Sequence, residues 1–190
     1  MRRVRIVNRC ATGALVAAMQ VAAAATVQAN GEVFTARASL ISADGATAYA
    51  AVKIVVSRWA TDREREDLIA AVRAGGTAAR DLLAARADAG TIQLGSRRTA
   101  IKYAYARPAD AGRLVTLVTS EPILFVGAGF TNAKPTAGYD LGLVLIDLDA
   151  AGFGHGELAP AAKVNLDEND AIVTEEYGAE VVRLGRVVRK

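Results

Sequence analysis

The sequence predicts an α+β protein that is mainly β, built as a single antiparallel barrel or sandwich of about 8–10 strands with an inserted αα-hairpin. Two observations lead to this fold class. Stretches of alternating apolar and polar residues recur with turn signals about every eight to twelve residues, which is typical of antiparallel β domains. The hydrophobic period becomes helical only between residues 61 and 87. Alternation alone does not distinguish a barrel from a sandwich, so the sequence leaves both open.

The first two strands are predicted at residues 32–41 and 47–58. The turn between them contains Asp44-Gly45, and glycine accepts the positive φ of a tight reversal without steric cost. The second stretch alternates clearly, which predicts a half-buried strand with one face toward the core. That inward face consists of Ala48, Ala50, Val52, Ile54 and Val56.

The helical insert is predicted at about residues 61–87. Thr61 and Glu64 have the spacing of a capping box, in which each side chain accepts a hydrogen bond from the other residue's backbone amide. Gly75-Gly76 predicts the end of this first helix, and a second helix follows from about residue 77. Trp59 lies at the junction of strand and helix, and we expect it to be a buried anchor that packs the helices onto the sheet.

After the helices the pattern returns to strands. Residues 113–119 and 141–148 are apolar on both faces, which predicts that these strands are central or covered by the helices. Residues 99–106 are predicted as one strand whose large side chains share a face: Ile101, Tyr103 and Tyr105. The other predicted strands lie near residues 92–94, 157–166, 171–177 and 179–188, with residues 167–170 as a hairpin loop.

The first 29 residues have the pattern of a cleaved signal peptide. Four arginines precede an apolar stretch at residues 11–25, and Val27-Gln28-Ala29 supplies the small residues of a cleavage site. We therefore expect a mature protein of one β-rich domain at residues 30–190, located in the periplasm or outside the cell. The apolar core of the leader is shorter than the about 20 residues that span a bilayer, so no transmembrane segment is expected after cleavage.

Cleavage would change the charge and the chemistry of the chain. The 23 basic residues include the four leader arginines, so that 19 would remain against 20 acidic residues, a net charge of −1. This balance removes the excess of basic residues that would have favoured a nucleic-acid or anionic-membrane partner, and no nucleic-acid partner is expected. Cys10, the one cysteine, lies in the leader, so the mature chain would contain neither a thiol nucleophile nor a disulfide.

Short motifs lie at residues 58–66, 138–141, 145–149, 152–158 and 162–164, together with Glu176-Tyr177 and Arg183-Leu184. These motifs resemble those of a family of small exported bacterial proteins with no established function. The resemblance covers most of the mature chain and implies a shared fold and export, but it supplies no catalytic residues.

Residues that could support catalysis or bind a metal are few. His155, the only histidine, lies between glycines and is predicted to be a solvent-facing turn residue. Asp147 and Asp149 faintly resemble the start of a calcium loop, but the bidentate glutamate of such a loop is missing. If this turn met the acidic loop at residues 167–170, the two could hold calcium weakly; otherwise they are ordinary acidic turns. No catalytic residue, metal or cofactor is predicted.

A ligand-binding region is predicted around the glycine-rich stretch at residues 127–138, which has no periodicity and is long for a hairpin loop. We expect this stretch to flank an apolar cavity. The expected ligand-binding residues are Phe125, Phe130 and Tyr139 near its mouth and Tyr103 lining the inside, although core packing is the simpler role for Tyr103.

The function predicted from the sequence is that of an exported, non-enzymatic binding or envelope-associated protein. Its expected partner is a small apolar ligand or another envelope protein. One alternative is a hydrolase or lyase that uses only carboxylates and tyrosines. A second is a structural or docking module that adds a strand at an exposed sheet edge.

Overall fold

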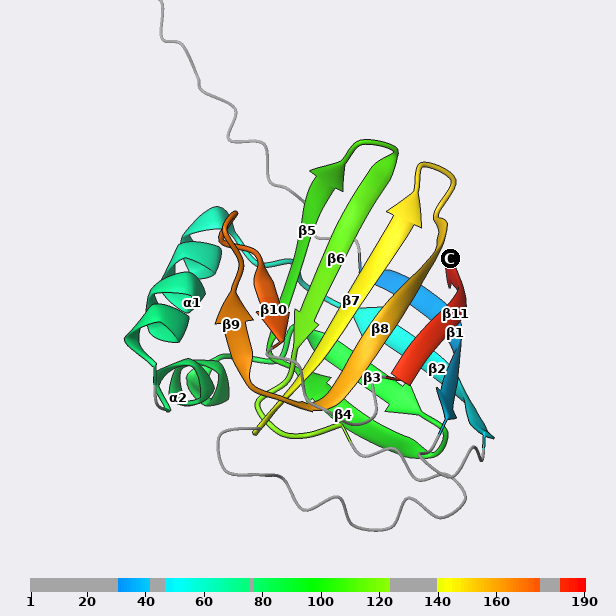
Figure 1. Ribbon diagram of the computed structural model, residues 1–190, viewed down its shortest axis with the longest axis horizontal. Coiled ribbons are helices and arrows are strands. Elements are labelled where there is room, and N and C mark those ends of the chain that lie inside the picture. Colours follow the sequence, from blue (N-terminus) through cyan, green and yellow to red (C-terminus); the bar gives the residue numbers. More distant parts are fainter. Residues whose placement is uncertain (1–30, 42–46, 76, 124–139, 175–181) are drawn as a thin grey trace, which may run out of the picture.

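The computed structural model of the protein describes residues 31–41, 47–75, 77–123, 140–174 and 182–190. A nine-stranded antiparallel sheet, in the order β4-β3-β2-β1-β11-β8-β7-β6-β5, curls until it nearly closes into a barrel. A second sheet of two strands, β9 and β10, and a helical pair lie against its outside (Figure 1). The mainly β fold class with an inserted αα-hairpin is therefore confirmed.

The elements have these bounds: β1 (Glu32–Ile41), β2 (Thr47–Val56), α1 (Asp62–Ala74), α2 (Ala78–Ala85), β3 (Gly90–Leu94), β4 (Arg97–Ile101), β5 (Tyr103–Ala109), β6 (Gly112–Val118), β7 (Leu141–Asp149), β8 (Phe153–Ala162), β9 (Val164–Leu166), β10 (Ile172–Thr174) and β11 (Val182–Arg189).

Strands β1 and β2 pair as predicted, continuously from Glu32 opposite Val56 to Ile41 opposite Thr47, while the predicted turn at Asp44-Gly45 lies outside the described residues. The predicted inward residues of β2 are buried or half-buried, and alternate with exposed side chains such as Lys53. Alternation was a sufficient guide here because both strands stay in one sheet and keep one face toward the core.

The predicted capping box of α1 is confirmed. The Glu64 amide donates to Thr61 Oγ1 at 3.2 Å, and the Thr61 amide donates to Glu64 Oε2 at 2.9 Å. Arg58 also donates to Glu64 Oε1 at 2.7 Å. Burial alone would raise the pKa of Glu64, but these hydrogen bonds and the Arg58 charge outweigh it and lower that pKa. Gly75, at φ +71°, ends the helix.

The prediction of a single strand at residues 99–106 is wrong, because the chain breaks at Lys102 into β4 and β5. These are the two edge strands of the nine-stranded sheet, and the Lys102 amide donates to the Val118 carbonyl at 2.9 Å. At this break the alternation of inward and outward side chains also shifts by one residue. Ile101 belongs to the barrel interior, whereas Tyr103 points to the outside and Ala104 takes the interior position.

A second predicted strand, at residues 157–166, also divides. It breaks at Lys163 into β8 of the barrel and β9 of the small sheet. At its other end β8 begins at Phe153, so His155 is a strand residue and the prediction of a turn is wrong, although its side chain is exposed as expected. Glycine composition misled this prediction. Gly154 is required because a Cβ there would overlap the Asp147 carbonyl of β7.

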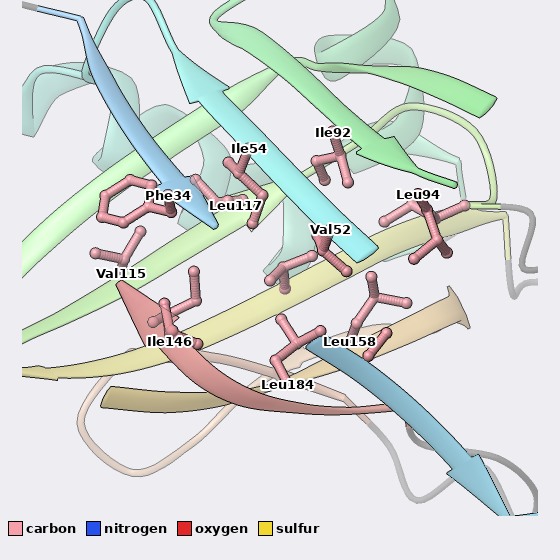
Figure 2. Packing of buried hydrophobic residues seen from close by; sticks show 14 of the residues in the cluster. Phe34, Val52, Ile54, Ile92, Leu94, Val115, Leu117, Ile146, Leu158 and Leu184 are labelled. Carbon is pink, nitrogen blue, oxygen red and sulfur yellow. The ribbon is translucent and has the colours of Figure 1, made fainter. Parts of the chain in front are cut away.

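The barrel interior is filled by the aliphatic side chains of its strands and by Phe34, as Figure 2 shows for the central members. A second apolar cluster lies on the outer face of the sheet, beneath the helices. It includes Leu68 of α1, Leu83 of α2 and Tyr103 of β5. Two layers of core explain why β6 and β7 are apolar on both faces, as predicted.

Trp59 takes a different position from the one expected. It is only half-buried and packs against the barrel interior, not against the helix-covered cluster. The Arg113 guanidinium lies 5.5 Å from the Trp59 ring and 5.8 Å from the Phe34 ring, and it forms an ion pair with Glu32. Trp59 thus packs at one end of the barrel, in the connection between β2 and α1.

Candidate functional site

The candidate site is a groove on the outer face of strands β5 to β8, beside the β9–β10 hairpin. Cross-strand pairing places four outward residues in one row: Arg107 opposite Leu114, Leu114 opposite Asp147, and Asp147 opposite His155. The hollow over this row has a volume of about 240 Å³. Its lining includes these residues together with Leu145, Glu157, Asp167, Ile172 and Val173.

The position of the groove follows from how much of this face the helices cover. Further along the same strands, Tyr103, Val118 and Leu143 are cross-strand neighbours and are fully buried in the cluster beneath the helices. Leu114 and Leu145 are only half-buried, and Leu145 packs against the margin of that cluster. The groove is therefore the part of a continuous apolar outer face that α1 and α2 leave open.

One wall of the groove is the β9–β10 hairpin, whose turn at residues 167–170 forms as predicted. Asp167 Oδ1 accepts hydrogen bonds from the amides of Asn169 and Ala171, both at 2.8 Å, which stabilises the turn. Arg65 of α1 donates to the Asp170 carbonyl at 3.2 Å, and Arg73 pairs with the Asp170 carboxylate. Helix α1 thereby holds this wall in place (Figure 1).

Charged side chains surround the apolar floor unevenly. Arg107 lies at one end of the row, whereas Asp147, Glu157 and Asp167 contribute three carboxylates. Within the described part of the chain, the side chains of Arg107, Asp147, His155 and Glu157 form no hydrogen bond or ion pair with another residue. Groups that are not already paired inside the protein are available to a ligand.

The described residues contain no group of three or more His, Cys, Asp or Glu that could hold a metal ion. Asp147 and Asp149 of β7 and the acidic residues of the β9–β10 turn do not form such a group, although Asp147 and Asp167 both line the groove. The arrangement that weak calcium binding would require is therefore not formed by these residues.

The predicted ligand-binding residue Tyr103 is 1% exposed and packs beneath the helices. Its ring stacks on that of Tyr105 at 6.2 Å, and the Tyr105 hydroxyl donates to Asp62 at 3.1 Å. Burial raises the pKa of both phenols, and for Tyr105 the Asp62 hydrogen bond raises it further. The shared face of the two rings is confirmed, and it faces the helices, not the barrel interior.

The other predicted ligand-binding residues, Phe125, Phe130 and Tyr139, lie outside the described residues, as does the glycine-rich stretch at 127–138. Their role in ligand binding stays a prediction. Sequence reasoning singled out Asp147 and His155 but missed that they are cross-strand neighbours. Residue spacing gave no signal for this pairing, because it depends on the register between β7 and β8.

A scan against protein-family models, a search of curated proteins and a search of solved structures each found no match to this chain. Among the described residues, no helix is long and apolar enough to cross a membrane.

Proposed function

We propose that this protein is an exported, non-enzymatic binding protein that takes a small, partly apolar ligand with a positively charged group in the outer groove. The observation that supports this most strongly is the groove itself. It combines an apolar floor from Leu114 and Leu145, a wall from Ile172 and Val173, and a rim of charged side chains, most of them unpaired. Export is proposed from the leader-like N-terminus.

The size of the groove limits the ligand. Pockets for drug-sized molecules span about 300–1,000 Å³. A hollow of about 240 Å³ is smaller, and it opens to solvent on the sheet surface. It suits a compact molecule of about one ring, or one side chain presented by a partner protein.

The charge of the groove favours a cation. Three carboxylates face one guanidinium among its lining residues, so the local charge is negative even though the mature chain would be nearly neutral. An ammonium group next to such carboxylates gains charge-assisted hydrogen bonds, whereas an anion would be repelled. An organic amine with an apolar body matches both the floor and the rim.

Benzylamine is a suitable probe, with benzoate and toluene as the anionic and neutral counterparts. Isothermal titration calorimetry should show benzylamine binding most tightly of the three, because it alone matches both the apolar floor and the acidic rim. Leu114→Arg should abolish this binding by filling the floor with a cation. Val55→Arg is the matched control, because Val55 is also half-buried on an outer strand face but lies on β2. Equal binding by the two variants, or tighter binding of benzoate, would contradict the proposal.

One observation favours an enzymatic alternative. The groove brings the only histidine of the chain opposite Asp147 and two residues from Glu157, which is a set of groups that can exchange protons. Tyrosine chemistry is less well supported, since Tyr103 is buried and its pKa is raised. Hydrolysis of p-nitrophenyl acetate that is lost in Asp147→Asn and retained in Glu66→Gln, a variant of an exposed α1 carboxylate, would favour this alternative.

A further inference from the structure

The acidic side chains of the described residues are concentrated on one side of the barrel, whereas basic side chains occur on both sides. Strands β1 to β4 and β11 carry one acidic residue, Glu32, and it is paired with Arg113 at the barrel end. Every other acidic residue of the described part lies outside these five strands. The same strands carry seven basic residues: Arg37, Lys53, Arg97, Arg98, Arg183, Arg186 and Arg189.

The strand register places the central members of this set on one outer face. Arg98 pairs with Gln93, and Gln93 pairs with Lys53. Lys53 lies opposite Thr35 of β1, two residues from Arg37. On the other side of β1, Arg183 of β11 lies opposite Ser39. We call this surface, formed by Arg37, Lys53, Arg98 and Arg183, the basic face.

The side chains of the basic face are exposed and unpaired. All four residues are solvent-exposed, and none forms an ion pair within the described part of the chain. The nearest carboxylate in the strand register is Glu157 of β8, opposite Arg183, which marks the border of the face. Four unpaired cations on neighbouring strands repel one another, and a negatively charged partner would relieve this repulsion.

The basic face also presents two large apolar side chains. Ile41 and Tyr49 are each 66% exposed and lie on the outward side of the β1–β2 hairpin. Tyr49 is opposite Ser39, and the Arg37 guanidinium lies 5.9 Å from its ring. Exposed apolar and aromatic side chains bordered by cations are typical of surfaces that enter the headgroup region of a bilayer.

We propose that the basic face docks onto an anionic lipid bilayer, with Arg37, Lys53, Arg98 and Arg183 against the headgroups and with Ile41 and Tyr49 entering the interface. A nucleic acid would also attract the cations, but it would leave Ile41 exposed. This proposal rests on the proposed function in one respect only, because export determines which membrane the protein meets. The groove lies on strands β5 to β8, so ligand binding and membrane docking can be tested separately.

The size of the effect follows from the number of cations. One basic side chain held near an anionic surface strengthens membrane partitioning by about fivefold, which corresponds to about 1 kcal/mol. Arg37→Gln combined with Lys53→Gln should therefore weaken partitioning by about 25-fold. Ile41→Ser should also weaken it, without changing the net charge, if this side chain enters the interface.

The matched control is Arg63→Gln of α1 combined with Arg80→Gln of α2, which removes the same two charges from the helical side of the molecule. The protein recovered from an exporting host is sedimented with vesicles of equal parts phosphatidylglycerol and phosphatidylcholine, and with vesicles of phosphatidylcholine alone. We expect wild-type protein and the control variant to bind the anionic vesicles equally, and the basic-face variant to bind about 25-fold more weakly.

Raising the salt from about 0.1 M to about 1 M should release the protein, because the Debye length falls from about 10 Å to about 3 Å. Equal losses in the two double variants would show that net charge alone matters, and this would overturn the proposal. Binding to double-stranded DNA without binding to anionic vesicles would also overturn it, as would equal binding to both kinds of vesicle. None of these results depends on whether benzylamine binds the groove.

Discussion

Replacing Leu83 with alanine tests whether helix α2 is part of the folded core. Leu83 is fully buried in the cluster beneath the helices, in contact with the outer face of the sheet. The substitution removes the equivalent of about three methylene groups, worth about 0.8 kcal/mol each, which gives about 2.4 kcal/mol from lost burial. The cavity left behind adds to this, so the free energy of unfolding should fall by about 3 kcal/mol.

Urea denaturation followed by circular dichroism measures this loss, and a constant slope would show that only stability has changed. For a domain of about 160 residues the melting temperature should drop by about 6–12 °C. Leu82→Ala is the matched control, because Leu82 precedes Leu83 on the same helix but is only partly buried. We expect Leu82→Ala to lower the free energy of unfolding clearly less than Leu83→Ala does. Equal losses below about 1 kcal/mol in both variants would refute the packing of α2 on the sheet.

The remaining predictions concern the helix cap, a buried phenol and export. Thr61→Ala should reduce the free energy of unfolding by about 1 kcal/mol through loss of the capping box, and an unchanged urea midpoint would contradict this. Tyr103→Phe should leave stability unchanged at neutral pH. Because burial raises the Tyr103 pKa above its ordinary value of 10, the folded wild type should lose stability as the pH rises past 10, and the variant should lose less. If the free energies of unfolding of the two proteins fell in parallel above pH 10, this would argue against burial of Tyr103. Protein recovered from an exporting host should begin at Asn30, and N-terminal sequencing that finds Met1 would argue against a cleaved leader.

The parts of the fold that were predicted correctly depend on local signals. The β1–β2 hairpin was found from strict alternation and a glycine turn, and α1 from the spacing of Thr61 and Glu64. The helical insert was found because its period differs from that of the flanking strands. In each case the residues that determine the structure lie within a few positions of one another.

The errors arose where closure of the barrel overrides local pattern. The alternation of Ile101, Tyr103 and Tyr105 continues through Lys102 without a signal, yet the chain passes there from one edge of the sheet to the other. The glycines beside His155 indicated a turn, although Gly154 is required by close approach to β7. Both features depend on partners far away in the sequence.

The groove was beyond sequence reasoning for the same reason. Its row of Arg107, Leu114, Asp147 and His155 comes from four strands, and only their register aligns the side chains. The residue types alone indicated isolated acidic residues and an isolated histidine. The opening of the groove depends in addition on where α1 and α2 stop covering the sheet.

The location of ligand binding tests the account most directly. Two-dimensional ¹H–¹⁵N NMR spectra recorded during a benzylamine titration report on every backbone amide at once. We predict that the largest shifts occur at Leu114, Asp147, His155 and Ile172, around the groove, and that strands β1 and β2 are unaffected. Shifts confined to other parts of the protein, or no saturable shift, would contradict a binding site on the outer face of the barrel.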